Sequence, residues 1–107
     1  QNNEGQINNT ESISAGLDYP GVSPIHCFLK DTKRARYTSA TDEDALNAYK
    51  LVTKLEKINP SLEPSHAFAE AIKIAPKLNK NTIIIVNSCG DAKKDRDILK
   101  ARLGKIN

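Results

Sequence analysis

The chain has 107 residues, of which 38% are hydrophobic and 27% are charged, and its formal net charge is +3. This length suffices for one small domain and is too short for two, and the composition is ordinary for a globular protein. The sequence contains no basic stripe with interleaved aromatic residues and no apolar run of membrane-spanning length, so nucleic-acid and membrane partners are not expected.

The amino-terminal stretch is polar. Residues 1–10 are rich in Asn, Gln, Gly and Glu, and we expect residues 1–11 to form a polar loop or a frayed end. Because the chain begins at Gln1 and contains no Met, we interpret it as a processed chain or a piece of a longer one. Whether it is a truncation, a proteolytic fragment or the product of a diverged gene stays open at this point.

The next residues combine turn-forming and helix-starting signals. Small residues, two glycines and a proline between residues 11 and 22 indicate an irregular segment in which backbone closely approaches another part of the molecule. Ser23 followed by Pro24 is the order of a helix cap and a first helical residue, which predicts a short helix running to about Leu29. Residues 36–40 are a candidate for a short strand.

Two helices are predicted in the middle of the chain. Thr41 caps the first, acidic residues 42–44 fill its first turn, and the segment 59–60 ends it. Its predicted inward residues recur at helical spacing and are Ala45, Ala48, Tyr49, Val52 and Leu55. The second helix starts near Pro64 and ends or kinks at Pro76, since a proline removes a helical hydrogen bond. Its predicted inward residues are Ala67, Phe68, Ala71, Ile72 and Ala75.

An unbroken β-branched run predicts a strand at residues 83–86. A strand covered on one face would alternate apolar and polar residues, so this one is expected to be buried on both faces, as in a parallel sheet. A charged helix over residues 93–103 follows. Its predicted inward residues are Ile98 and Leu99. The alternation of helices and strands predicts an α/β fold with a ligand site after the strand, where Cys89 and Gly90 lie.

The residues by themselves favour a small α/β ligand-binding domain. Strand ends of this kind are common, so the pattern indicates a place for a ligand without indicating its chemistry. The two cysteines, Cys27 and Cys89, form no CxxC pair and suit a reducing compartment, so we expect a cytoplasmic protein.

Four motifs carry a more specific signal. The first is SISAGLDYPGV at residues 12–22, followed by Pro24 and His26. The others are Thr41-Asp42-Glu43 with Ala45-Leu46, then Pro60 with Leu62-Glu63 and Ser65-His66-Ala67, then Val86-Asn87 with Gly90 and Lys94-Asp95. In these motifs, in their order and nearly in their spacing, the chain resembles the carboxy-terminal part of the tryptophan synthase beta chain.

The resemblance implies a fold-type II pyridoxal-phosphate enzyme, in which residues 12–107 are a parallel-sheet segment of an α/β fold that is incomplete alone. It implies a lyase of tryptophan biosynthesis that makes L-tryptophan from L-serine and indole with pyridoxal 5'-phosphate. The implied partners are the remainder of the beta chain, a second beta chain in a homodimer, and the tryptophan synthase alpha subunit. The family's Schiff-base lysine and Gly-rich phosphate loop lie upstream of these motifs, so we expect the 107 residues alone to be inactive.

Two carboxylates are the catalytic residues that the resemblance implies. Asp18 matches the aspartate that meets the substrate serine hydroxyl when the site closes, and its alternative role is an Asx-type turn residue before Tyr19. Glu63 matches the carboxylate beside the cofactor. It could equally be an acidic residue favoured by the amino-terminal end of the following helix, and these two roles are compatible.

The resemblance also implies cofactor-binding residues after the predicted strand, in addition to Glu63. Cys89 matches a serine that hydrogen-bonds the pyridine nitrogen, where a neutral group leaves the cofactor a weaker electron sink than a carboxylate would. The alternative for Cys89 is a small buried residue at the end of a strand. Gly90 is expected to lie where a side chain would crowd the cofactor ring.

A monovalent cation is a second implied ligand. Tyr19 and Gly21 match positions whose backbone carbonyls bind Na⁺ or K⁺ in this family, and carbonyl oxygens suit such hard cations. Because any residue type supplies a carbonyl, a plain turn is the alternative at both positions.

Some residues depart from the family pattern. Asp91, Ala92 and Lys93 stand where the family has a basic, glycine-containing run, and Ser23 and Ile25 replace a glycine and a polar residue. These departures leave an alternative function open. In that alternative, a diverged or truncated relative serves as a non-catalytic binding or structural α/β module.

Overall fold

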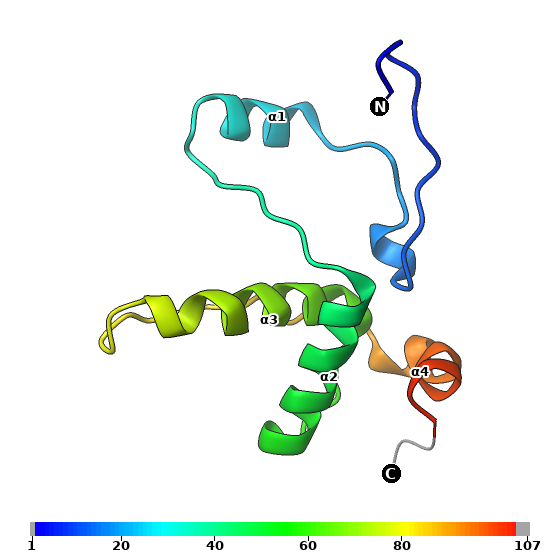
Figure 1. The fold of residues 1–107 in the computed structure, drawn as a ribbon, viewed down its shortest axis with the longest axis vertical. Helices are drawn as coiled ribbons and strands as arrows, with labels where there is room; N and C mark the ends of the chain where they lie inside the picture. Colours follow the sequence, from blue (N-terminus) through cyan, green and yellow to red (C-terminus); the bar gives the residue numbers. More distant parts are fainter. Residues whose placement is uncertain (1, 105–107) are drawn as a thin grey trace.

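The computed structural model describes residues 2–104, which form helices joined by turns and extended segments (Figure 1). The α-helices are α1 at Pro24–Asp31, α2 at Asp42–Glu56, α3 at Leu62–Ile74 and α4 at Arg96–Leu103. The 3-10 helices are η1 at Ala15–Leu17, η2 at Ala75–Lys77 and η3 at Ala92–Asp95. No helix in this part of the chain is both long and apolar enough to cross a membrane.

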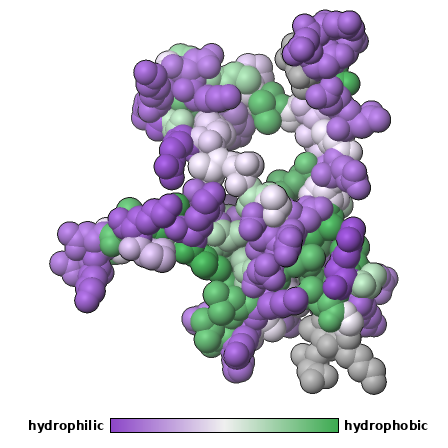
Figure 2. Space-filling model, in the orientation of Figure 1, coloured by the Kyte–Doolittle hydropathy of each residue, from purple (hydrophilic) through white to green (hydrophobic). Residues whose placement is uncertain are grey.

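A small apolar core joins the start of the chain to α2, α3 and α4. Its buried side chains are Ile13, Tyr49, Leu62 and Leu99, with Leu46 and Leu103 packed against them. Helices α2 and α3 pack against each other and cross, while α1 stands apart on a long excursion of the chain (Figure 1). Apolar side chains gather over the end of the molecule formed by α2 and α4, and the far end of α3 is mainly hydrophilic (Figure 2).

Local signals set where α2 begins, as predicted. The Thr41 hydroxyl accepts a hydrogen bond from the Asp44 N–H at 3.1 Å, and the Asp44 carboxylate accepts one from the Thr41 N–H at 2.9 Å. These reciprocal bonds form a capping box. Hydrogen bonds from the Thr41 backbone and hydroxyl lower the pKa of Asp44. The helix ends at Glu56, before the predicted stop at residues 59–60, where Lys57 adopts the left-handed conformation.

Replacing Thr41 by Ala should therefore destabilise the protein. The variant loses the hydroxyl that caps α2, and we expect its free energy of unfolding to fall by about 1 kcal/mol. Urea denaturation followed by circular dichroism measures the change. Thr38→Ala is the matched control, because Thr38 is exposed and lies outside any helix. Equal stabilities of the two variants would show that the cap contributes nothing measurable.

The other predicted helices are confirmed, with shifts at their ends. The Ser23 hydroxyl caps α1 by accepting a hydrogen bond from the Ile25 N–H at 3.2 Å. Helix α3 begins before the predicted start at Pro64 and ends before Pro76, which lies in η2. The helix predicted over residues 93–103 is divided into η3 and α4.

The inward faces predicted for α2 and α3 are wrong in part. Leu55 is 63% exposed, Ile72 is 41% exposed, and Ala67 and Ala75 are also exposed. In α4, Ile98 was predicted to face inward and is 36% exposed. Helix α3 projects beyond its crossing with α2, which leaves its outer turns open (Figure 1). Its buried residues all lie in the first turns and are Leu62, Pro64 and Ser65. Only the amino-terminal end of α3 is therefore part of the core.

The parallel-sheet segment is not confirmed, because residues 2–104 contain no strand. Residues 83–86, predicted to form a strand, have no regular secondary structure, and Ile83 is 85% exposed and Ile85 is 90% exposed. The strand candidate at residues 36–40 likewise has no regular secondary structure. A strand needs a neighbouring strand to satisfy its backbone groups, and the described residues supply none. Predicted burial on both faces is therefore wrong for this chain.

Residues 2–11 are exposed and precede η1. Asn2 Oδ1 accepts hydrogen bonds from the backbone N–H groups of Glu4 at 3.0 Å and Gln6 at 2.8 Å, which makes a local turn. This exposure agrees with a polar loop. The division of the chain into residues 1–11 and 12–107 stays a prediction.

Candidate active site

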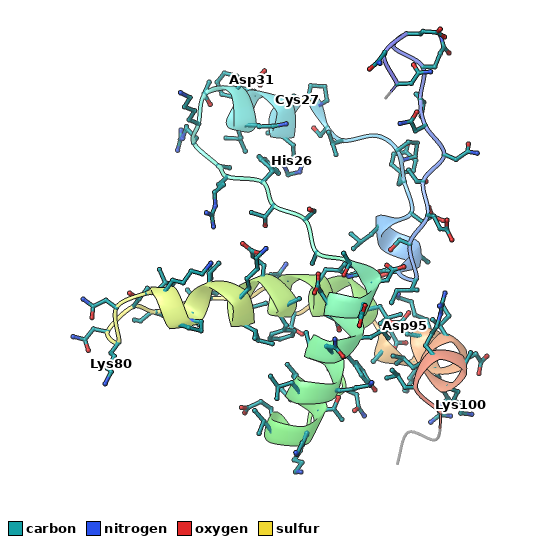
Figure 3. All side chains as sticks on the ribbon, viewed as in Figure 1. His26, Cys27, Asp31, Lys80, Asp95 and Lys100 are labelled. Atoms are coloured by element: carbon teal, nitrogen blue, oxygen red, sulfur yellow. The ribbon has the colours of Figure 1, made fainter. Side chains whose placement is uncertain are left out.

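The amino-terminal end of α3 brings together residues from distant parts of the sequence. We call this cluster the α3 corner, and its members are Gly16, Glu63, Gly90, Lys94 and Asp95. Gly16 lies in η1, Gly90 lies in the turn before η3, and the last two residues lie in η3. Figure 3 shows Asp95 between α4 and the crossing of α2 and α3.

Glu63 is the centre of the α3 corner. Its Oε1 accepts hydrogen bonds from the Gly16 N–H at 3.0 Å and from the Lys94 ammonium at 2.6 Å. Its Oε2 is buried and has no hydrogen-bond partner among the described residues. Burial raises the pKa of Glu63, but hydrogen bonds from Lys94 and from backbone N–H groups outweigh it and lower this pKa to about 2. The carboxylate is therefore ionised at neutral pH and has one buried acceptor oxygen left over.

Asp95 connects η3 to the first turn of α3. Its side chain is 2% exposed, and its Oδ2 accepts a hydrogen bond from the Leu62 N–H at 2.8 Å. Its Oδ1 accepts one from the Lys94 ammonium at 3.0 Å, so Lys94 bridges Asp95 and Glu63. Burial lowers the pKa of Lys94, but its hydrogen bonds to the two carboxylates outweigh that effect and raise it. The ammonium is therefore fixed between two negative charges.

Two glycines let the backbone approach this network closely. A Cβ on Gly16 would lie 2.8 Å from Glu63 Oε1. Gly90 has a φ of +89°, and a Cβ there would lie 2.6 Å from Ser61 Oγ and 3.7 Å from Glu63 Oε2. Ser61 is itself held, because its hydroxyl donates a hydrogen bond to the Cys89 carbonyl at 2.8 Å. Neither glycine has room for a side chain without displacing its neighbours.

The structure brings three of the predicted site residues together. Gly90 lies beside Glu63, and the Cys89 carbonyl is held through Ser61. The Cys89 thiol is free and exposed. The alternative interpretation of Cys89 as a buried residue at a strand end is therefore wrong for this structure, since no strand or sheet covers it in residues 2–104.

The other predicted site residues follow η1 and are exposed. Asp18 directly follows η1 as its carboxy-terminal cap, and Tyr19 is 74% exposed. Asp18 comes shortly after Gly16 in the sequence, so the chain leads directly from the α3 corner to Asp18. The described part of the chain has no group of three or more His, Cys, Asp or Glu side chains that could hold a metal ion. A cation on the carbonyls of Tyr19 and Gly21 stays a prediction.

Sequence reasoning assigned no role to Gly16, Lys94 or Asp95. The close backbone approach predicted for residues 11–22 is confirmed at Gly16, but the sequence did not show which residue it would meet. Lys94-Asp95 was part of a motif, and its place shortly after the turn at Gly90 was the available signal. Charged residues next to a predicted ligand site, such as Lys94 and Asp95, are reasonable candidates for site residues.

Comparison with known proteins gives a separate result. No family model matches the chain. The tryptophan synthase beta chain of Fusobacterium nucleatum is 60% identical over 94 residues, which are 88% of this chain and 24% of the relative. The tryptophan synthase beta chain of Bordetella petrii is 51% identical over 97% of this chain and 26% of the relative. That of Allorhizobium ampelinum is 53% identical over 89% of this chain and 23% of the relative.

These matches confirm the resemblance that the four motifs predicted. The chain spans about a quarter of the length of the curated relatives it matches, in their carboxy-terminal part. They do not favour the alternative of a diverged binding module. Homology to these proteins supports an origin of the fold in fold type II of the pyridoxal-phosphate enzymes. By its sequence, the chain is homologous to the carboxy-terminal part of the tryptophan synthase beta chain.

Proposed function

We propose that residues 12–107 are part of a tryptophan synthase beta chain, a pyridoxal-phosphate-dependent lyase that makes L-tryptophan from L-serine and indole. The observation that supports this most is Glu63, which matches the family's carboxylate beside the cofactor. It is ionised, anchored through Oε1, and left with a buried Oε2 that has no partner in residues 2–104. Because the family's Schiff-base lysine lies upstream of the matching motifs, activity requires the remainder of the beta chain.

The α3 corner fits pyridoxal phosphate in two respects. The buried Oε2 of Glu63 offers an ionised acceptor to a polar edge of the ring, and Gly90 keeps a side chain out of the adjacent space. Glu63, Cys89 and Gly90 would therefore hold the cofactor. When bound, pyridoxal phosphate supplies the electron sink for removing the serine hydroxyl and adding indole.

The proposal gives each residue of this chain a separate role. Asp18 binds the serine hydroxyl and fixes its orientation when the site closes. Glu63 stays ionised and accepts a hydrogen bond from the cofactor through Oε2. Cys89 would hold the cofactor on the side of its ring nitrogen. Gly16 keeps Asp18 near Glu63, because its N–H donates a hydrogen bond to Glu63 and Asp18 follows two residues later.

The family resemblance supports further ligands and partners. The carbonyls of Tyr19 and Gly21 are proposed to bind Na⁺ or K⁺. A second beta chain in a homodimer and the tryptophan synthase alpha subunit are the proposed protein partners. The cytoplasm is the proposed compartment, since the two free cysteines, Cys27 and Cys89, suit reducing conditions.

A hybrid protein tests the proposed function. It joins the upstream part of the Fusobacterium nucleatum tryptophan synthase beta chain to residues 12–107, and we call it the hybrid. We expect the hybrid to bind pyridoxal phosphate, measured by visible absorption, and to form tryptophan from serine and indole. Bound cofactor without tryptophan formation would contradict the proposed activity, and absence of bound cofactor would contradict the proposed site.

In the hybrid, Asp18→Ala should lower kcat/KM for serine by about 100-fold. Its affinity for pyridoxal phosphate should change little, because Asp18 is assigned to the substrate and not to the cofactor. Steady-state kinetics and cofactor titration measure the two effects, with the exposed Asp31→Ala in α1 as control. The role of Asp18 is wrong if the variant purifies without cofactor and shows normal kinetics after reconstitution.

A further inference from the structure

The two carboxylate oxygens of Glu63 lie in different surroundings. Oε1 accepts hydrogen bonds from the Gly16 N–H and the Lys94 ammonium, and the Lys94 contact is the shorter at 2.6 Å. Oε2 is buried, has no partner among the described residues, and would lie 3.7 Å from a Cβ on Gly90. Hydrogen bonds from the protein thus fix Oε1, and Oε2 lies beside the turn proposed to hold the cofactor.

Lys94 is held from two sides. Its ammonium lies 3.0 Å from Asp95 Oδ1 as well as 2.6 Å from Glu63 Oε1. Asp95 is buried and accepts a hydrogen bond from the N–H of Leu62, the residue before Glu63. Both carboxylates that bind Lys94 are therefore attached to the first turn of α3. An ammonium fixed in this way restricts rotation of the Glu63 carboxylate, since charge-assisted hydrogen bonds are short and strong.

We propose that Lys94 is a positioning residue, which holds Oε1 of Glu63 so that Oε2 is presented as the acceptor for the cofactor. The inference rests on the proposed function, which places the cofactor beside Glu63. Without the ammonium, the side chain of Glu63 keeps only backbone N–H partners, of which the Gly16 N–H lies 3.0 Å from Oε1. The carboxylate can then rotate, and neither oxygen has a fixed place.

Removing Lys94 also changes the protonation of Glu63. The charged groups at this carboxylate in the described residues are Lys94 and, behind it, Asp95, while Gly16 contributes a backbone N–H. Burial raises the pKa of Glu63 and Lys94 lowers it, so loss of Lys94 lets this pKa rise from about 2. A protonated Glu63 no longer offers an ionised acceptor, which moves the acidic limb of activity to higher pH.

Three substitutions separate positioning from a purely structural role. Lys94→Met removes the ammonium, Lys94→Arg keeps the charge, and Lys93→Met removes the exposed neighbouring lysine as a control. The carboxyl carbon shift of Glu63, followed against pH by NMR in the 107-residue chain, reports its pKa. We expect Lys94→Met to raise the pKa of Glu63 by about 1–3 units, and the other two variants to leave it near the parent value. An unchanged pKa in Lys94→Met overturns the proposal.

The hybrid supplies the catalytic readout. We expect Lys94→Met to lower kcat by about 10- to 100-fold and to move the acidic limb of kcat/KM upward, with Lys94→Arg restoring both. If Lys94→Met lowered the unfolding midpoint but left the acidic limb of kcat/KM at the parent pH, Lys94 would have a structural role only. That result would overturn the proposal. A parent hybrid without cofactor refutes the proposed function, and the NMR titration of Glu63 still decides the inference about Lys94.

Discussion

Replacing Gly90 by Ala should lower the free energy of unfolding of the hybrid by about 2–5 kcal/mol and abolish cofactor binding. The φ of +89° at Gly90 is one that L side chains rarely adopt, and the new Cβ would lie 2.6 Å from Ser61 Oγ. Ser61 has little freedom to move away, because its hydroxyl binds the Cys89 carbonyl at 2.8 Å. Urea denaturation measures the stability, and visible absorption measures the bound cofactor.

Gly104 provides the matched control for this substitution. It also has a positive φ, +74°, but a Cβ there would meet no atom within 4 Å. Gly104→Ala should therefore cost only the backbone strain, about 1–3 kcal/mol. Adding Ser61→Ala to Gly90→Ala removes the nearest atom and should recover part of the loss. Equal losses for the two glycine variants would contradict the steric explanation.

Asp95→Ala is expected to destabilise the protein by about 1–3 kcal/mol, because it leaves the buried Leu62 N–H without an acceptor. The substitution removes the acceptor of the Leu62 N–H and one of the two carboxylates that hold Lys94, at a side chain that is 2% exposed. A buried N–H without an acceptor and an ammonium with one partner fewer both raise the free energy of the folded state. Chemical denaturation at pH 7 measures the change.

Two further aspartate substitutions identify the cause of this loss. Asp97→Ala is the control, and because Asp97 is exposed its effect should stay within about 0.5 kcal/mol. Asp95→Asn keeps an oxygen for the Leu62 N–H but loses the charge that faces Lys94, so its loss should be smaller than that of Asp95→Ala. Similar stabilities of Asp95→Ala and Asp97→Ala would contradict the importance of the buried network.

The starts of α1 and α2 could be predicted because their signals are local. The Thr41 and Asp44 groups that cap α2 are a few residues apart, so neighbours in the sequence decide the geometry. The strand at residues 83–86 could not be decided in this way. Its β-branched residues favour an extended backbone, but a strand forms only against a partner strand, and none is present in residues 2–104. The residue types alone could not show whether a partner strand would be present.

The candidate site was predictable where the resemblance named a residue. Glu63 and Gly90 were identified in this way, and the structure places the Cβ position of Gly90 3.7 Å from Glu63 Oε2. Gly16 and Lys94 were not, because their hydrogen bonds to Glu63 span 47 and 31 residues. No local pattern encodes contacts over such separations, which depend on how the helices pack. The role of Asp18 stays a prediction, because it depends on the bound substrate.

The sequence separations of Glu63 from Gly16 and from Lys94 have a consequence for the nascent chain. A ribosome delivers Gly16 and Glu63 before Lys94, so the first turn of α3 is complete while η3 is still being synthesised. The entropic costs of closing the two loops differ by less than about 1 kcal/mol, so loop entropy does not impose another order. Until η3 emerges, Glu63 has the Gly16 N–H as a partner but no ammonium. Its carboxylate then takes up a proton more readily than in the finished fold, and the arrival of Lys94 lowers its pKa.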